Sequence, residues 1–229
     1  MSLVADCRKR SSLPIVTRKR PALTQADYVE AAVEFVKEHG IAAMTMRALG
    51  DQMGVDATAL YRHFPNKDSL IAAMVDWVLG KAVEEAQAVT GTPRERMRGI
   101  NLAMRNAFRR WPQIALELFQ GEAGMAENSG VLSNLGIEAL RDLGLKGESL
   151  VRGYQMIEGY AMGTCVHDFA GAPHNMGIRR LRYRSFDVPE FDDVARSDTL
   201  AADIAEQSFL RGLDALIDEC ERIAAQGRW

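Results

Sequence analysis

Apolar residues recur at spacings of three and four along most of this chain, which is the pattern of amphipathic helices with one buried face. The first such segment covers residues 24–39. Thr24 and Asp27 have the spacing of a capping box, and Gly40 is placed to end the helix. The sequence therefore predicts a first helix here, with an apolar face made by Ala26, Val29, Val33 and Val36.

Two shorter helical patterns follow back to back, over about 46–53 and 57–63. Thr45 and Asp56 are placed to cap their N-termini, and Gly54 lies in the connection, where a positive φ is often needed. Two compact helices joined by a glycine-containing turn form a helix-turn-helix, whose second helix can enter the major groove of DNA. Because this unit is too small to bury its own core, we expect the remaining helices to support and control it.

The rest of the chain carries six further helical patterns, with Asn66, Pro93 and Ser197 placed at helix starts. We expect helices over about 67–89, 93–110, 114–119, 131–143, 148–170 and 198–225. Glycine, proline and charge runs between them predict loops over 121–130 and 171–197, the second long and mobile. No segment alternates as a strand does, so the sequence predicts an all-α protein of about nine helices.

The same pattern divides the chain into three parts. Residues 1–22 are expected to form a flexible basic arm and residues 23–66 a three-helix, helix-turn-helix domain. Residues 67–229 are expected to form a larger helical domain.

The composition is that of a folded helical protein, and its charge is distributed unevenly along the chain. The chain is 47% hydrophobic and 26% charged, which is ordinary for globular proteins, and aromatic residues are only 7%, which favours helices over sheets. The net charge is −3, yet residues 1–22 alone carry +5, which leaves −8 for the rest. A basic arm on an acidic body is suited to contact phosphates. The six basic residues of the arm are Arg8, Lys9, Arg10, Arg18, Lys19 and Arg20.

Several other classes of protein lack their signals in this chain. The three cysteines form no CxxC pair, there is no run of about 18 apolar residues to span a membrane, and the N-terminus lacks a secretory signal. We therefore expect a reduced, cytoplasmic protein. His167, Asp168 and His174 match no standard metal spacing, and the sequence holds no nucleophile elbow, HExxH, P-loop or GxGxxG motif. These observations predict no metal, no cofactor and no enzyme activity.

The stretch from Thr24 to Leu70 resembles the DNA-binding domain of TetR-family transcriptional regulators. The region beyond it matches the family only in the number and order of its helices. The motifs that carry the resemblance are His39-Gly40, Thr45-x-Arg47-x-Leu49-Gly50, Gly54-Val55, Leu60-Tyr61-x-His63-Phe64, Asn66-Lys67 and Leu70.

The resemblance implies DNA contacts for nine residues: Thr45, Arg47, Ala57, Thr58, Ala59, Tyr61, Arg62, His63 and Lys67. Thr45, Tyr61, His63 and Lys67 would contact phosphates, Arg47 a phosphate or a base, and the leading turn 57–59 the bases. Alanines offer only apolar contacts, so hydrogen bonds to bases are expected mainly from Thr58, Arg62 and Arg47.

Other interpretations of these residues stay open. Tyr61 could be a core residue, His63 a structural cap, and Arg47 a solvated surface residue. Many relatives also have Ser where this chain has Asp56, Gly or Pro at Thr58, and Ser or Thr at Ala59.

The larger domain is rich in methionine and aromatic residues, and the helix over 148–170 contains three glycines. Ordinary core packing is the simple interpretation, but methionine adapts to irregular space, and the resemblance implies a cavity for a largely apolar effector. Tyr154 and Glu158, one helical turn apart, could supply its polar contacts. The candidate lining residues are Met97, Ile100, Met104, Phe108, Trp111, Phe119, Tyr154 and Glu158.

The resemblance as a whole implies a homodimeric, ligand-responsive repressor that binds a near-palindromic double-stranded operator. Helices 148–170 and 198–225 would form the dimer interface, and two half-sites would lie about 34 Å apart. The effector would shift the helix that starts at Lys67. The alternatives are a small-molecule sequestering protein whose helix-turn-helix does not bind DNA, and a transcriptional activator of the same fold.

Overall fold

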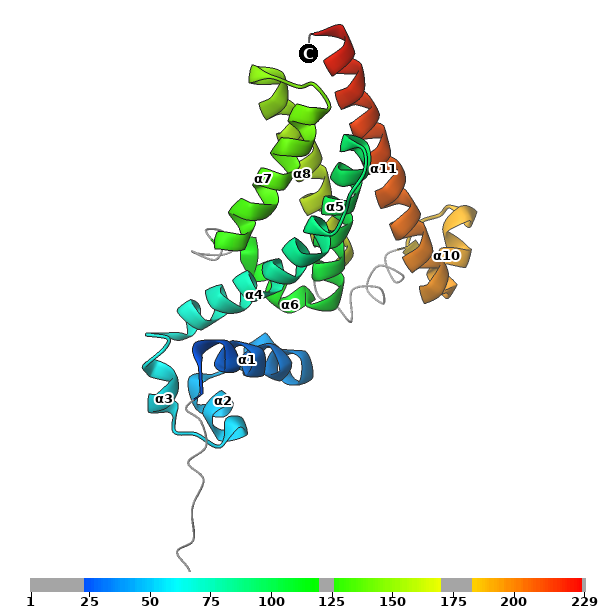
Figure 1. Cartoon of the computed structure of the whole chain (residues 1–229). Helices are drawn as coiled ribbons and strands as arrows, with labels where there is room; N and C mark the ends of the chain where they lie inside the picture. Colours follow the sequence, from blue (N-terminus) through cyan, green and yellow to red (C-terminus); the bar gives the residue numbers. More distant parts are fainter. Residues whose placement is uncertain (1–22, 120–125, 170–182, 228–229) are drawn as a thin grey trace, which may run out of the picture.

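The computed structural model describes residues 23–119, 126–169 and 183–227, which contain helices and turns but no strand. Figure 1 shows α1, α2 and α3 gathered at one end, with α4 running from them into a bundle of α5, α7, α8 and α11. The α-helices are α1 (Gln25–His39), α2 (Met46–Met53), α3 (Ala57–Tyr61), α4 (Lys67–Gln87), α5 (Pro93–Arg110), α6 (Pro112–Ala115), α7 (Glu127–Asp142), α8 (Gly147–Phe169), α10 (Asp192–Arg196) and α11 (Asp198–Gln226). Short 3₁₀ helices are η1 (Ile41–Ala43), η2 (Leu116–Phe119) and η4 (Pro189–Phe191). The all-α prediction is confirmed.

Local capping signals fix most helix starts. Five predicted caps each accept a hydrogen bond from a backbone N–H of the helix that follows: Thr24, Thr45, Asp56, Asn66 and Ser197. Gly40 and Gly54 end α1 and α2 with φ of 83° and 68°, values that residues with a Cβ rarely adopt.

The prediction of a loop over 121–130 is wrong for its last four residues, because α7 begins at Glu127. Ala126, at the start of α7, makes no side-chain cap. The cap comes instead from α4: Asp76 Oδ1 accepts from the backbone N–H of Asn128 at 2.9 Å, and Asn128 Nδ2 donates to Asp76 Oδ2 at 2.9 Å. Residues 120–125 lie outside the described part of the chain.

The predicted loop over 171–197 is also wrong in its second half, where η4 and α10 lie. α10 is the helix that raises the number within the described ranges to ten. The rings of Tyr183, Phe186 and Phe191 pack together there, with centroids 5.3 to 6.2 Å apart, and give this charged segment a small apolar centre. Residues 170–182 fall outside the described ranges.

One apolar core runs through both parts of the molecule. It begins with Val33 of α1 and Leu49 of α2, continues along Met74 of α4, and reaches Phe108 of α5 and Leu132 of α7. A second core joins α5, α7, α8 and α11. Ala26, which we predicted on the apolar face of α1, is exposed. No helix of the described ranges is both long enough and apolar enough to cross a membrane.

A buried arginine ties three helices of the bundle together. The Arg105 side chain of α5 is 2% exposed and donates to Asp168 of α8 at 2.7 Å and to Glu206 of α11 at 3.0 Å. Its guanidinium carbon lies 5.0 and 4.4 Å from the ring centroids of Phe169 and Phe209. Asp168, which we considered as a metal ligand, thus neutralises a buried charge.

A close approach between α8 and α11 depends on Gly212. The Tyr160 hydroxyl donates to the carbonyl oxygens of Ser208 and Phe209, at 3.0 and 3.1 Å, and its ring stacks on that of Phe209. A Cβ on Gly212 would lie 2.0 Å from this hydroxyl oxygen. Only a residue without a side chain fits here.

We therefore expect Gly212→Ala to destabilise the fold by about 1–2 kcal/mol, since overpacking outweighs the gain in helix propensity. Gly130→Ala in α7 is the control, because nothing lies within 4 Å of its added Cβ. That change should stabilise the protein by up to about 1 kcal/mol. Urea unfolding followed by circular dichroism, at one protein concentration, measures both. A Gly212→Ala protein as stable as wild type would contradict the packing described.

Candidate DNA-binding surface and ligand cavity

Five predicted DNA-contacting residues present exposed side chains on α2, α3 and the residues flanking them. Figure 1 places α2 and α3 at the end of the molecule opposite the C-terminus of α11. The Arg47 side chain is 89% exposed, and its Nε lies 4.0 Å from Asp51, a separation too long to fix it in place. Tyr61 is 52% exposed, so it is not a core residue. The five are Thr45, Arg47, Thr58, Tyr61 and Arg62, and His63, described below with its ring contact, is exposed as well.

The Thr58 hydroxyl is oriented by the cap of its own helix. Asp56 Oδ1 accepts from the Thr58 hydroxyl at 2.6 Å and from the Thr58 backbone N–H at 2.8 Å. These two hydrogen bonds, the hydroxyl first, lower the pKa of Asp56, so this carboxyl stays ionised. The hydroxyl proton is thereby engaged, and Thr58 Oγ1 presents only its lone pairs to the outside.

The other predicted DNA residues have contacts within the protein. The exposed His63 ring lies 5.1 Å from the ring of Tyr28, and the half-buried Lys67 donates to the carbonyl of Ile41 at 3.4 Å. Ala57 and Ala59 are half-buried, and Ala59 packs against the core. The basic arm, 1–22, lies outside the described residues.

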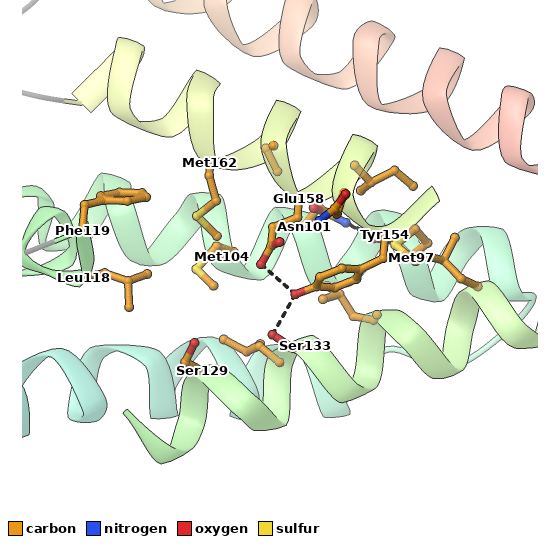
Figure 2. A pocket seen from close by; sticks show the side chains of 18 residues that line it. Met97, Asn101, Met104, Leu118, Phe119, Ser129, Ser133, Tyr154, Glu158 and Met162 are labelled. Atoms are coloured by element: carbon orange, nitrogen blue, oxygen red, sulfur yellow. Dashed lines mark hydrogen bonds between the residues drawn. The ribbon is translucent and has the colours of Figure 1, made fainter. Parts of the chain in front are cut away.

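A cavity of about 560 Å³ lies between α5, η2, α7 and α8 (Figure 2). Two predicted lining residues do not border it. Phe108 is fully buried in the core, and the Trp111 ring instead packs edge-on against Trp77, with centroids 5.3 Å apart. Six predicted residues do border it: Met97, Ile100, Met104, Phe119, Tyr154 and Glu158.

Sequence reasoning missed the whole α7 wall, one polar residue of α5, and several residues of α8 and η2. Asn101 lies on the same face of α5 as Met97 and Met104, so its spacing could have revealed it. Of the α7 wall, only Ser129 lay in the segment that was predicted as a loop. The other four residues lie in the predicted helix 131–143, but its packing against α5 and α8 was not predicted. The additional lining residues are Asn101, Leu118, Ser129, Leu132, Ser133, Gly136, Leu140, Gln155, Ile157, Gly159, Ala161 and Met162.

A hydrogen-bonded polar group occupies one end of the cavity. The Tyr154 hydroxyl lies 2.7 Å from Glu158 Oε1 and 2.8 Å from Ser133 Oγ (Figure 2). Because a carboxylate can only accept, Tyr154 donates to Glu158 and the Ser133 hydroxyl donates to Tyr154. Burial raises the pKa of Tyr154 to about 12, so the phenol stays protonated at neutral pH. The site thus combines apolar walls with an acceptor-rich end.

The raised pKa of Tyr154 predicts a late alkaline titration. An ordinary phenol ionises near pH 10, whereas Tyr154 should ionise at about pH 12. The unfolded chain releases this proton first, so the phenol's contribution to stability is complete below about pH 10 and is lost as pH rises to about 12. The phenolate absorbance of wild type minus that of Tyr154→Phe isolates this one of the five tyrosines. A midpoint near pH 10 in chains still folded by circular dichroism would refute the prediction.

Comparison with known proteins finds relatives in sequence and in fold. Residues 29–74 match the family described as bacterial regulatory proteins, tetR family. Over 222 residues the chain is 25% identical to the HTH-type transcriptional repressor DrrR1 of Streptomyces coeruleorubidus, an alignment that covers 91% of this chain and 81% of that protein.

The fold is similar to that of apo ActR from Streptomyces coelicolor, with a TM-score of 0.67, 21% identity and coverage of 90% of this chain and 98% of that one. ActR in complex with actinorhodin gives a TM-score of 0.63, 22% identity and coverage of 88% and 98%. The helix-turn-helix with its capped α2 and α3, the family match over it and the shared all-helical fold lead to one conclusion. The helix-turn-helix domain of this chain belongs to the TetR family of bacterial regulatory proteins, and the whole chain shares the fold of a solved structure similar to it.

Proposed function

We propose that this protein is a homodimeric transcriptional repressor that binds operator DNA through α2 and α3 and releases it when an effector fills the cavity. The observation that carries the proposal is the exposed polar face of α2 and α3, joined by one continuous core to a helical bundle with a cavity. In this proposal residues 23–66 bind DNA and residues 67–229 bind the effector and the second protomer.

DNA binding would place α3 in the major groove, with phosphates held on both sides of it. Thr45 and Tyr61 are exposed and neutral, as suits phosphate contacts that position the protein. Lys67 is held only by a 3.4 Å hydrogen bond and could turn to a phosphate, and His63 could contact one while resting on Tyr28. The basic arm, 1–22, would follow the backbone or enter the minor groove.

Base recognition would fall on Thr58, Arg62 and Arg47. Since the Thr58 proton is directed to Asp56, its oxygen would accept from a base. The donors in the major groove are the amino groups of adenine and cytosine, so Thr58 favours one of these two bases. Arginine in contrast prefers guanine, and Ala57 can contact a thymine methyl.

Dimer formation would use the outer faces of α8 and α11. Val151 of α8 and Ile204 of α11 are 56% and 42% exposed, although both are apolar. Gly163 of α8 has open space where a Cβ would be, which leaves room for a second helix to approach closely. Burial of these residues against a second copy would set two α3 helices on successive turns of DNA, about 34 Å apart.

Effector binding would act on α4 indirectly, because none of the described residues of α4 lines the cavity. Two sets of contacts support an indirect route from the cavity to α4 and the start of α2. Phe119 of η2 borders the cavity, and Gln113 in the adjoining α6 accepts from the backbone N–H of Ile41 at 2.9 Å, four residues before Thr45. On the other side Ser129 borders the cavity next to Asn128, which is bonded to Asp76 of α4. Effector and DNA would be coupled if the effector prefers one arrangement of these links.

The effector would be largely apolar, as most of the lining is. ActR, whose fold is similar, has been solved in complex with actinorhodin, so a related fold binds a small molecule.

The DNA-binding proposal predicts separable effects of three substitutions. Arg47→Ala and Tyr61→Phe should each weaken binding about tenfold with the fold intact, and Arg47→Ala should lower the salt slope by about 1 if it binds a phosphate. Thr58→Val should relax the preference for adenine or cytosine at one position. Lys81→Ala, in the far half of α4, is the control and should change nothing. Fluorescence anisotropy with the DNA upstream of the gene, at several salt concentrations, measures affinity, and selection from random DNA measures preference.

Unchanged affinity of Arg47→Ala and Tyr61→Phe would overturn the assigned surface. A wild-type dimer that forms no specific complex at low salt would favour the sequestering protein instead. Increased transcription on binding would identify an activator.

The coupling route predicts that Gln113→Ala weakens the release of DNA by the effector more than it weakens binding of the effector itself. Loss of the bond to Ile41 frees η1 from α6, so the effector should release DNA less completely than in wild type, while effector affinity stays within about twofold. Ligand-dependent DNA release by anisotropy, beside direct ligand titration, separates the two quantities. Unaltered release would exclude this link.

A further inference from the structure

The cavity has an unbalanced charge. Among its lining residues in the described ranges, Glu158 is the one charged side chain, and no lysine, arginine or histidine accompanies it. Glu158 Oε1 accepts from Tyr154, while its second oxygen accepts no hydrogen bond from a described residue. A carboxylate in this setting can only accept hydrogen bonds and attract positive charge.

A second acceptor is available in the wall. Asn101 is 9% exposed, and its amide nitrogen donates to the carbonyl oxygen of Met97 at 2.8 Å and to the Met97 sulfur at 3.4 Å. Its amide oxygen accepts no hydrogen bond from any part of the chain that the structure describes. An amide oxygen accepts hydrogen bonds, so this one is available to a donor on a bound molecule.

The opposite end of the cavity is apolar. Figure 2 shows Leu118 and Phe119 at the end away from Tyr154, with Met104 and Met162 between. Methionines adjust to flat or irregular apolar bodies, and about 560 Å³ accommodates a drug-sized molecule.

From this arrangement we infer that the effector is an apolar molecule that carries a hydrogen-bond donor, best a protonated amine, bound by Glu158 and Asn101, and that anionic molecules are rejected. The inference rests on the proposed function of the cavity as the effector site. An anion would be repelled by Glu158 without gaining a cation, whereas an ammonium group would gain the carboxylate and a neutral hydroxyl would gain one hydrogen bond.

Three anthracene probes with the same ring and different charge test this inference. They are 9-(aminomethyl)anthracene, a cation, 9-(hydroxymethyl)anthracene, a neutral donor, and 9-anthracenecarboxylate, an anion. Fluorescence titration of the full chain at neutral pH should give saturable binding of the amine and the alcohol. The carboxylate should bind at least about tenfold more weakly than the amine, as the loss of a charge-assisted bond implies.

Glu158→Gln should remove the preference for the amine over the carboxylate, while the amide oxygen still accepts a hydrogen bond from Tyr154. The amine should bind about tenfold more weakly, the carboxylate should improve, and the alcohol should change least. Glu138→Gln, an exposed change on α7 outside the lining, is the matched control and should leave all three affinities unchanged. Gly159→Leu, which extends a side chain from the cavity wall, should weaken all three probes.

Equal or tighter binding of the carboxylate in wild type would overturn the inference, as would undiminished discrimination in Glu158→Gln. Absence of saturable binding by all three probes, or binding that Gly159→Leu leaves unchanged, would overturn it as well. The outcome is separable from the proposed function. If the cavity prefers the amine but no operator complex forms, the proposed regulator function is refuted and this inference stands. If an operator complex forms but the carboxylate binds best, the proposed function stands and this inference is refuted.

Discussion

Burial of α4 on several sides is the constraint on which the rest of the structure depends. Val33 of α1, Met74 of α4 and Phe108 of α5 belong to one apolar core, so the helices that face DNA share their interior with the helices that enclose the cavity. Moving either group against α4 would expose apolar surface, which costs about 25 cal/mol for each Å². The two groups can therefore change position only through small rearrangements of packed helices, and the proposed coupling between the cavity and α2 and α3 would act through such rearrangements.

What could be predicted from the sequence is what neighbouring residues determine. Thr24, Thr45 and Asn66 cap helices through atoms two or three residues away, so the starts of α1, α2 and α4 follow from local spacing. The α5 and α8 walls of the cavity were likewise predictable, because Met97, Met104 and Tyr154 lie at helical spacing among residues of the right chemistry. The predicted DNA-contacting residues came from the resemblance, and the structure shows that six of the nine are exposed.

What could not be predicted depends on residues far apart in the chain. Phe108 follows Met104 by one turn, yet the packing of α4 against α5 buries it in the core and away from the cavity. Ser133 is one polar residue among several of its helix, and only the meeting of α7 with α5 and α8 makes its hydroxyl part of a site. The same holds for Asp168, whose partner Arg105 lies 63 residues earlier.

The cap that α4 provides for α7 has a consequence for how the molecule assembles. Ala126 gives the first turn of α7 no local cap, and Asp76 supplies one from 52 residues away. An isolated chain segment would therefore leave this turn frayed, because its orphan N–H groups have no acceptor until α4 is in place. The first turn of α7 should become ordered late, after α4 has formed and docked. Ser129 belongs to this turn, so this part of the cavity wall depends on the contact between α4 and α7.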